Sequence, residues 1–359
     1  MAEPTPLPQG AVIGILGGGQ LGRMLSVAAA RLGYRTHIYE PGAAPAADVA
    51  AFWTQAPYDD PDALAAFAAA VDVVTYEFEN IPTAALDQIE AQAPIRPGRG
   101  ALAASQDRLE EKTFLNGLGL KTAPFAAVED VASLDAALLG VGTPAILKTR
   151  RFGYDGKGQI RLTAPGEAEA ALAALKGAPA VLEGHVDFQT ELSVIVARGL
   201  GGAVVAYDPG VNLHEDGILR RTTVPAPLPA ALRTDAVLLA GRIVTALDYV
   251  GVLGVELFAA RGGLLVNEIA PRVHNSGHWT QNACAVDQFE QHIRAITGLP
   301  LGDGSRFADV TMENLIGEDI SRLVDLTQTP NAALHLYGKA ETRPGRKMGH
   351  VNHVHPIPA

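Results

Sequence analysis

The first hundred residues alternate between short apolar runs and longer stretches in which apolar residues recur at helical spacing. The runs at 11–16, 35–39 and 71–76 are compact and rich in β-branched residues, which predicts buried parallel strands. The stretches at 20–32 and 62–70 predict the connecting helices, and Gly33 suits a helix end because it tolerates a left-handed backbone. This alternation predicts a doubly wound parallel-sheet domain.

The rest of the chain predicts a more mixed architecture. Helices are expected at 105–115, with Ser105 as N-cap, at 230–247 and at 286–297. Strands are expected at 145–149 and 159–163 around a glycine loop, as an antiparallel sheet at 180–182, 191–197 and 203–207, and at 254–258, 264–268, 333–337 and 348–354. Proline and glycine at 96–100 and 298–300 mark breaks. The predicted class is α/β and α+β, with domains at 1–104, 105–300 and 301–359 and a small loop-bearing subdomain at about 122–185.

Composition narrows the functional classes. The chain has 359 residues with 28 Lys and Arg against 39 Asp and Glu, so the net charge of −11 argues against coating nucleic acid. A single cysteine, Cys284, forms no internal disulfide and is expected to be a small core residue in a reducing compartment. Without a signal peptide or an apolar run of membrane-spanning length, the sequence predicts a cytoplasmic protein with no membrane partner.

A glycine motif follows the first predicted strand. Gly17-x-Gly19-x-x-Gly22 opens a helix, and Glu40 ends the next strand where the ribose-binding acid of a dinucleotide fold lies. Three interpretations fit this motif: an NAD site, another phosphate ligand at the helix N-terminus, or only a tight strand-to-helix turn. The motif alone does not decide among them.

Two features of the middle region suit nucleotide phosphates. Lys148 ends an apolar strand, where its ammonium group can neutralise phosphate, although such a lysine is more often a solvated strand end. The loop after it reads Arg151-Phe152-Gly153-Tyr154-Asp155-Gly156-Lys157-Gly158-Gln159, and its glycines allow it to close over phosphates. A plain surface hairpin is the alternative.

Two further features suit a metal and a developing anion. Glu256 and Glu268 lie among apolar residues on neighbouring strands, where an unpaired charge is costly, and with Asn267 they offer the hard oxygen ligands that Mg²⁺ prefers. The polar loop from Arg272 to Thr280 follows directly, and Arg272 is suited to stabilising a transferred carboxyl or phosphoryl group. By contrast, His350, His353 and His355 are expected to alternate along a strand rather than to bind metal.

In combination these motifs resemble the ATP-grasp superfamily and, within it, the 5-(carboxyamino)imidazole ribonucleotide synthases. The resemblance covers nearly the whole chain, and its most specific string is Asn267-Glu268-Ile269-Ala270-Pro271-Arg272-Val273-His274-Asn275-Ser276-Gly277-His278. Tyr76-Glu77-Phe78-Glu79-Asn80 and Arg343-Pro344-Gly345-Arg346-Lys347 also match. The resemblance implies a Rossmann-like first domain, an ATP-grasp domain with a mobile lid, and a C-terminal β-rich domain.

The resemblance also implies residue roles. The expected ATP contacts are Arg108, Lys148, Gly153, Tyr154, Asp155, Gly156, Lys157, Gly158, Gln159, Glu183, Gly184, His185, Val186, Glu191, His214, Asn267 and Glu268. Within this set, Glu191 is expected at the ribose hydroxyls and Glu183 and Val186 at the adenine. The expected Mg²⁺ ligands are Glu256 and Glu268.

A second implied set binds 5-aminoimidazole ribonucleotide. It comprises Gln20, Leu21, Glu77 or Glu79, Asp155, Arg272, His274, Asn275 and Ser276, with Lys339 and Arg346 at the phosphate. Arg272, Asp155, His274 and Lys148 are the expected catalytic residues. The glycine turn would then serve the ribonucleotide rather than NAD.

The implied reaction consumes ATP and bicarbonate and carboxylates the ribonucleotide amine, through carboxyphosphate or released carbon dioxide, in purine biosynthesis. A homodimer is expected, as is a separate mutase that consumes the product, since the sequence ends shortly after Arg346. The alternatives are another ATP-grasp purine ligase such as a formate-dependent glycinamide ribonucleotide transformylase, an NAD-dependent oxidoreductase, and a nucleotide-sensing module without turnover.

Overall fold

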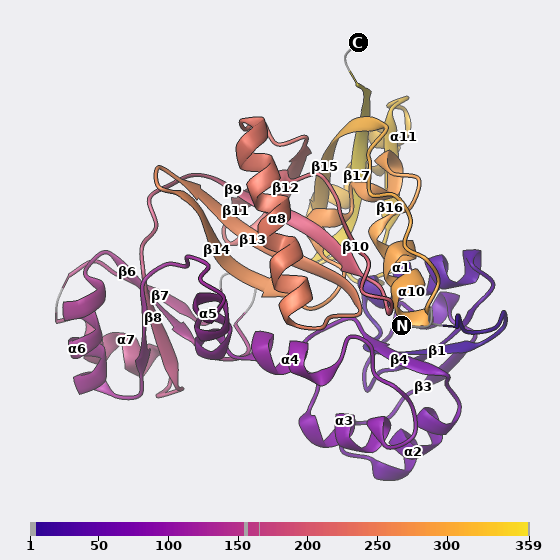
Figure 1. Cartoon of the computed structure of the whole chain (residues 1–359), viewed down its shortest axis with the longest axis horizontal. Helices are drawn as coiled ribbons and strands as arrows, with labels where there is room; N and C mark the ends of the chain where they lie inside the picture. The colour runs from indigo at the N-terminus through magenta and orange to yellow at the C-terminus, as the bar shows by residue number, and fades with distance from the viewer. Residues whose placement is uncertain (1–4, 154–156, 165, 358–359) are drawn as a thin grey trace.

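The N-terminal region is a four-stranded parallel sheet with helices on both faces. In a computed structural model that describes residues 5–153, 157–164 and 166–357, the strand order is β3-β2-β1-β4. The strands are β1 (Val12–Leu16), β2 (Arg35–Tyr39), β3 (Phe52–Thr54) and β4 (Val73–Tyr76). The helices α2 (Pro61–Ala69) and α3 (Thr83–Glu90) pack on one face, and α1 (Gln20–Arg31) on the other (Figure 1). The predicted parallel, doubly wound arrangement is confirmed.

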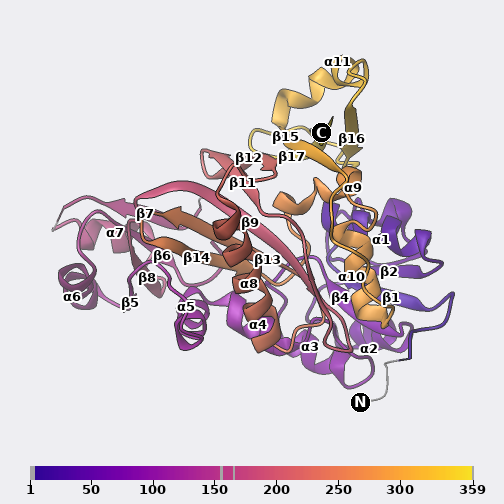
Figure 2. The ribbon, with the colours of Figure 1, turned by 45° about the horizontal axis from the view of Figure 1, so that its top comes forward.

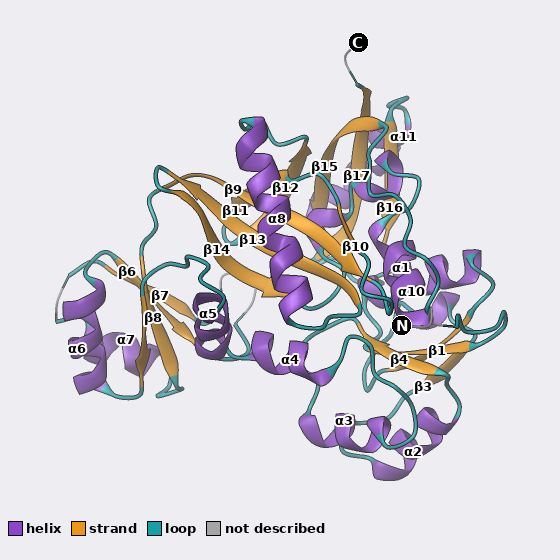
Figure 3. Cartoon of the chain, in the orientation of Figure 1, coloured by secondary structure: helices purple, strands orange, loops and turns teal. Residues whose placement is uncertain are grey.

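A small antiparallel sheet forms a separate lobe at one end of the molecule. Its order is β5-β8-β6-β7, and two helices cover it (Figures 1 and 3). The elements are β5 (Phe125–Val128), α6 (Val131–Val141), β6 (Ala145–Thr149), β7 (Gln159–Leu162), α7 (Ala168–Ala174) and β8 (Ala180–Gly184). The glycine loop connects β6 to β7, as predicted. β8 was expected in the sheet with 191–197 and instead pairs with β5 and β6, because the chain leaves this lobe after Gly184.

A large antiparallel sheet crosses the centre of the molecule. Its order is β14-β13-β9-β11-β12-β15-β17-β16, with β10 also paired to β9. The central strands are β9 (Phe188–Arg198), β10 (Val204–Ala206), β11 (Gly210–Glu215), β12 (Ile218–Val224), β13 (Gly251–Ala260) and β14 (Gly263–Ala270). Helix α8 (Ala230–Ala246) covers one face with an apolar side that includes Ala236, Ala240 and Ile243.

The C-terminal strands extend this central sheet. They are β15 (Ala308–Ile316), β16 (Ala332–Leu336) and β17 (Lys347–Pro356), with α11 (Leu323–Thr327) beside them (Figure 2). β15 pairs with β12, so the C-terminal segment is hydrogen-bonded to the sheet that carries Glu256 and Glu268. His350, His353 and His355 lie on β17, as their alternation predicted.

Helices between the sheets join the parts. α10 (Gln288–Thr297) packs against α1, β9 and β13, so it connects the first sheet to the central one, and the short α9 (Thr280–Ala283) precedes it. The helix predicted from Ser105 begins elsewhere: α4 (Arg99–Gln106) ends there and α5 (Arg108–Gly117) follows. Asp107 is the N-cap of α5, because its carboxylate accepts from the Leu109 N–H, whereas Ser105 bonds back to the Ala101 carbonyl within α4.

The expectation that Cys284 is a core residue is confirmed, since it is a buried free cysteine. Trp279 also lies in the core and is almost completely enclosed. Within the described ranges, no helix combines the length and apolarity needed to cross a bilayer.

Candidate active site

A cavity of about 630 Å³ opens where the lobe, the central sheet and the N-terminal region meet. It brings together most of the residues that the sequence singled out. Those lining it are Gln20, Leu21, Glu77, Glu79, Arg108, Lys148, Gly153, Lys157, Gln159, Glu183, Gly184, His185, Val186, Glu191, His214, Glu256, Asn267, Glu268, Arg272, His274 and Asn275. Segments more than 200 residues apart therefore converge on one site.

Some expected site residues lie elsewhere. Tyr154, Asp155 and Gly156 fall outside the described residues. Ser276 is fully buried behind the wall, with its hydroxyl 2.8 Å from Nδ1 of His274. Gly158, Lys339 and Arg346 are not among the lining residues; Lys339 donates to the Lys347 carbonyl and Arg346 to the Glu341 carbonyl. Lys347, the neighbour of Arg346, does line the cavity.

The two strand carboxylates lie directly opposite each other. Glu256 on β13 and Glu268 on β14 are register partners, as the sequence analysis required. The register shifts immediately after this pair, so that Leu257 faces Val266 and Asn267 is the extra residue of a β-bulge. A regular strand would turn Asn267 away from the face that carries Glu268. The bulge explains how both consecutive side chains line the cavity.

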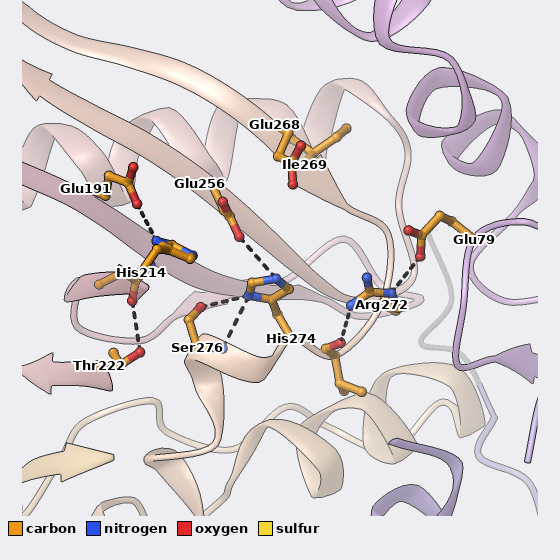
Figure 4. A network of polar contacts seen from close by, with 12 residues as sticks. Glu79, Glu191, His214, Thr222, Glu256, Glu268, Ile269, Arg272, His274 and Ser276 are labelled. Carbon is orange, nitrogen blue, oxygen red and sulfur yellow. Dashed lines mark hydrogen bonds and ion pairs between the residues drawn. The ribbon is translucent and has the colours of Figure 1, made fainter. Parts of the chain in front are cut away.

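The two carboxylates have pKa values shifted in opposite directions. Burial and the adjacent Glu268 raise the pKa of Glu256, whose Oε1 lies 3.2 Å from Nε2 of His274 (Figure 4). Burial opposes ionisation of Glu268 too, but Arg108 at 2.7 Å outweighs it and lowers the pKa of Glu268. Burial, followed by the charge of Arg272, lowers the pKa of His274 to about 3, so this imidazole is neutral.

This donor set fits a hard divalent cation. Two carboxylates held together raise each other's proton affinity, and a cation between them relieves that repulsion. In the described ranges, no cluster of three or more His, Cys, Asp or Glu side chains is arranged to hold a metal. Mg²⁺ needs no such cage, since it commonly takes one or two carboxylates and completes its shell with substrate phosphates and water.

Helix α5 anchors the bulge from outside the sheet. β14 is an edge strand, and Oε1 of Glu111 accepts the Ile269 N–H at 2.7 Å while Nζ of Lys112 lies 3.3 Å from the Asn267 carbonyl. Both side chains are almost fully buried. Burial, with a contribution from Glu268, raises the pKa of Glu111 to about 8, so the residue is largely neutral near pH 7. Sequence reasoning missed both residues because they lie on a helix with no motif.

Replacing Glu111 with alanine tests this anchor. The Ile269 N–H then loses its acceptor inside the protein, which is expected to cost about 1–3 kcal/mol of unfolding free energy. The apparent KM for metal-bound ATP should rise about 10-fold, the usual scale for removing an outer-shell support. Glu111→Gln keeps an acceptor at that position and should recover most of both losses. Urea melts and initial rates measure the two effects, and equal behaviour of the two variants would contradict the anchoring role.

A lysine pair surrounds Glu183 on β8. Nζ of Lys148 and of Lys112 lie 3.0 and 3.2 Å from Oε2 of Glu183, and together they lower the pKa of this carboxyl despite its burial. Oε1 of Glu183 is buried with no hydrogen-bond partner in the described part of the chain. One oxygen therefore holds the lysines at the cavity, and the other is available to accept from a ligand amino group.

Glu191 on β9 is paired with His214 on the neighbouring β11 (Figure 4). Burial alone would lower the pKa of His214, but the hydrogen bond and charge of Glu191 outweigh it and raise that pKa. Both side chains line the cavity. The pair provides a fixed polar edge near the carboxylates.

The glycine turn before α1 is occupied by the protein's own carboxylates. Glu77 accepts from the backbone N–H groups of Gly19 and Gly22, and Glu40 accepts from Gly18 at 3.0 Å. A Cβ built on Gly17, whose φ is +104°, would lie 2.5 Å from Cγ of Glu77. The glycines thus make room for Glu77, and the N–H groups that a dinucleotide pyrophosphate requires are already used. The NAD interpretation of this motif is wrong.

Arg272 is oriented by the second acid of the same segment. Its Nε donates to Glu79 at 2.7 Å, and one terminal nitrogen lies 3.3 Å from the Val273 carbonyl (Figure 4). Burial opposes its charge, but Glu79 outweighs burial and raises the pKa of Arg272. The guanidinium is therefore a fixed positive group on the cavity wall. Of the acidic pair, Glu77 contacts the glycine turn and Glu79 contacts Arg272.

Ten further residues line the cavity that were not assigned to the site from the sequence. They are Phe78, Asn80, Ala123, Ile146, Phe188, Gly217, Leu219, Phe258, His278 and Lys347. Six of them are apolar residues that sequence alone cannot distinguish from core, although Phe188 and Phe258 stack with ring centres 4.6 Å apart. Asn80, His278 and Lys347 lie inside the quoted motifs, so their polarity within those motifs could have identified them as site residues from the sequence.

Comparison with known proteins agrees with this geometry. Residues 11–106 match the ribonucleotide synthetase preATP-grasp domain, 113–289 the ATP-grasp domain, and 311–357 the phosphoribosylaminoimidazole carboxylase C-terminal domain. The N5-carboxyaminoimidazole ribonucleotide synthase of Brucella melitensis is 54% identical over 358 residues, which is 99% of each chain.

Two solved structures extend the comparison to ligand complexes. The Staphylococcus aureus N5-carboxyaminoimidazole synthetase with ADP has a TM-score of 0.93 at 36% identity, covering 98% of this chain and 95% of that one. The Aspergillus clavatus synthase with ADP and 5-aminoimidazole ribonucleotide has a TM-score of 0.91 at 32% identity, covering 97% and 94%. On sequence, fold and the arrangement of its cavity, the chain belongs to the N5-carboxyaminoimidazole ribonucleotide synthase family of ATP-grasp ligases.

Proposed function

We propose that the protein carboxylates the amine of 5-aminoimidazole ribonucleotide with bicarbonate, consuming ATP and giving N5-carboxyaminoimidazole ribonucleotide, ADP and phosphate. The observation that carries this proposal is the opposed pair Glu256 and Glu268, in one cavity with Lys148 and Arg272. The high identity to a synthase of this name supports it. The step belongs to purine biosynthesis.

The ATP half of the site is built for charge neutralisation. Glu256 and Glu268, with Asn267, would hold Mg²⁺, which supplies Lewis-acid stabilisation of phosphate charge when bound. Lys148 and Arg108 add two cations, and the loop containing Gly153, Lys157, Gly158 and Gln159 would close over the phosphates. Glu183, with its open oxygen, is suited to the adenine amino group, and Glu191 to the ribose hydroxyls.

The chemistry then needs positioning and exclusion of water more than a nucleophilic side chain. A bicarbonate oxygen attacks the γ-phosphorus, and the bond to the β–γ bridging oxygen breaks as ADP leaves. The ribonucleotide amine attacks the carboxyl carbon of carboxyphosphate, or of the carbon dioxide formed from it, and loses a proton as phosphate departs. Arg272 would stabilise the negative carboxyl oxygens, and enclosure of the cavity would protect carboxyphosphate from hydrolysis.

The ribonucleotide half lies toward the N-terminal region. Gln20 and Leu21 begin α1 beside Glu77, and Asn275, from the loop after β14, lines the same cavity. Both polar atoms of the Asn275 side chain are buried without a partner in the described part of the chain, which a bound ligand would correct. The preceding residue, His274, has its Nε2 3.2 Å from Oε1 of Glu256.

Mutations can separate the contributions of the basic C-terminal residues that are proposed to bind the ribonucleotide phosphate. Because Lys347 lines the cavity and Lys339 donates to the Lys347 carbonyl, Lys347→Met should raise the KM for the ribonucleotide about 10-fold or more. Lys339→Met should raise it less, since it acts through the backbone of Lys347. Initial rates at saturating ATP measure both. A larger effect from Lys339 would restore the clamp expected from sequence, with Lys339 and Arg346 as direct ligands.

The decisive experiment is ADP release with purified protein. Release should require bicarbonate and 5-aminoimidazole ribonucleotide together, and formate should not replace bicarbonate. ADP release with formate and glycinamide ribonucleotide would indicate the transformylase instead, and nucleotide binding without turnover would indicate a sensor. Failure of the joint dependence with folded protein would refute the proposed reaction.

The proposed function also includes a cellular location, an oligomeric state and an enzyme that consumes the product. We expect a cytoplasmic homodimer whose product passes to a separate mutase, because the carbamate formed must be rearranged before it is useful. Sedimentation of the purified protein tests the dimer, and a coupled assay with added mutase tests the transfer.

A further inference from the structure

Gln288 is a buried amide behind the cavity wall. It is the first residue of α10, has no solvent-accessible surface, and directs its side chain at the loop that carries His274, Asn275 and His278. Its Oε1 accepts the His274 N–H at 2.9 Å, and its Nε2 donates to the His274 carbonyl at 2.8 Å. The same Nε2 lies 3.0 Å from Nδ1 of His278.

These contacts determine the tautomer of His278. A backbone N–H can only donate and a carbonyl can only accept, so His274 fixes which end of the Gln288 amide is oxygen. The NH₂ end therefore faces Nδ1 of His278, which must carry a lone pair. Burial, with smaller effects of nearby charges, lowers the pKa of His278 well below its ordinary value, so the ring is neutral. Its one proton is then on Nε2.

The His278 ring is also held in place. It packs against the ring of Phe289 at 5.5 Å and of His350 at 4.6 Å, and it lines the cavity. No hydrogen bond to Nε2 of His278 is seen from the residues that the structure describes. Lys347 lines the same cavity and is one of the charges that act on His278. An oxygen-rich anionic ligand beside Lys347 would meet a neutral donor at His278.

Gly277 shows how closely the loop fits this amide. A Cβ at Gly277 would lie 2.6 Å from Oε1 of Gln288, so a side chain there would displace it. Thr280 completes the connection, because its hydroxyl accepts the Gln288 N–H at 3.0 Å and donates to the Gly277 carbonyl at 2.7 Å. The loop and the start of α10 therefore form one hydrogen-bonded unit.

We propose that Gln288 is a positioning residue that fixes the backbone of His274 and holds His278 as the Nε2–H tautomer, so that His278 donates to an oxygen of the ribonucleotide. The identity of that ligand rests on the proposed function. The tautomer and the loop geometry do not, because they follow from contacts within the protein.

The chain offers a matched control in Gln291. It lies on the same helix, is equally buried, and holds Gly302 in the same way: its Nε2 donates to the Gly302 carbonyl at 2.8 Å and its Oε1 accepts the Gly302 N–H at 2.8 Å. Neither Gln291 nor Gly302 lines the cavity. A change at Gln291 therefore reproduces the loss of a buried amide clamp without touching the site.

The test compares Gln288→Glu with Gln291→Glu in the full-length protein. A carboxyl at 288 still accepts from the His274 N–H but lacks the NH₂ that faces His278. We expect the KM for 5-aminoimidazole ribonucleotide to rise about 10-fold in Gln288→Glu and the KM for ATP to change less than about 2-fold. Gln291→Glu should lower the melting temperature similarly and leave both KM values near those of the wild type.

A second readout is independent of turnover. In ¹⁵N-histidine-labelled protein, the His278 signal, identified by its loss in His278→Phe, should show the Nε2–H tautomer and should change in Gln288→Glu. Absence of that tautomer in the wild type would overturn the proposal, as would equal ribonucleotide KM values in the two glutamate variants. If the wild type shows the tautomer but no ribonucleotide-dependent turnover, the proposed reaction fails while the positioning role of Gln288 stands.

Discussion

Glu268→Gln should lower kcat/KM for metal-bound ATP by about 100-fold or more while the protein stays folded. The glutamine has the same shape but carries no charge, so a cation at the site would keep only Glu256 as an anionic ligand. The expected size of the effect is that seen when one hydrogen-bond donor that stabilises transition-state charge is removed, which typically lowers kcat about 100-fold or more. Initial rates over a Mg²⁺ titration measure it.

The folded state should tolerate this change because two effects oppose each other. The pKa of Glu268 lies below its ordinary value, so ionised Glu268 contributes stability above the unfolded pKa, and that contribution disappears as pH falls through the folded pKa. The variant loses this contribution, including the full-charge pairing with Arg108. It also removes the like charge that raises the pKa of Glu256, which should therefore fall.

A control on the same sheet separates metal binding from general charge loss. Glu313 on β15 pairs with Arg322 at 2.7 Å and does not line the cavity. Glu313→Gln should leave kcat/KM near that of the wild type. Wild-type activity in Glu268→Gln, or equal losses in the two variants, would remove Glu268 from the metal site.

The strand carboxylates were predictable because their chemistry conflicts with their surroundings. An acid among apolar strand residues needs a partner, and that requirement singles out Glu256 and Glu268 from the sequence alone. Their direct pairing confirms the geometric premise of the ATP-grasp interpretation. The bulge that brings Asn267 to the same face was not predictable, because it depends on how β14 aligns with β13 and on anchoring by α5.

The glycine turn shows the opposite case, in which the motif left several ligands open and one of them, NAD, was wrong. Gly17, Gly19 and Gly22 fit a dinucleotide fold, but the same glycines accommodate Glu77, which arrives from the end of β4. The glycine spacing indicates that another group approaches the backbone closely at this turn. It does not identify that group. Only the tertiary structure identifies that partner as a carboxylate of the same chain.

How well the bounds of a strand could be predicted also depended on whether local sequence or tertiary structure determines them. Strands β2 and β6 match their predicted bounds, since each is a compact apolar run between clear breaks. β11 and β12 were missed because Asn212, His214 and Arg221 interrupt any apolar pattern there. His214 borders the cavity, Arg221 is exposed to solvent, and the buried Asn212 accepts a hydrogen bond from the Thr222 hydroxyl. Each of these environments is a fact of tertiary structure.

Arg272→Lys is expected to reduce kcat about 100-fold with little change in the KM for ATP. Both side chains are cationic near neutral pH, so this substitution keeps the positive charge but removes the planar guanidinium with its several fixed N–H donors. In the wild type, Nε of Arg272 is committed to Glu79 while other guanidinium N–H groups remain for a ligand. A lysine has one ammonium group on a flexible stem, and pairing with Glu79 would draw it away from the developing carboxyl charge.

The division between kcat and KM distinguishes this role from a structural one. Because the lysine still offers Glu79 a cation, the melting temperature should change little, whereas Arg272→Ala would leave a buried carboxylate unpaired. ADP release that continues in the presence of bicarbonate and the ribonucleotide, but without formation of the carboxylated ribonucleotide, would place Arg272 at carboxyl transfer. Arg322→Lys, which alters a half-exposed pair with Glu313, should have no such effect. A variant with wild-type kcat, or one impaired only in ATP affinity, would show that Arg272 acts elsewhere than on the carboxyl group.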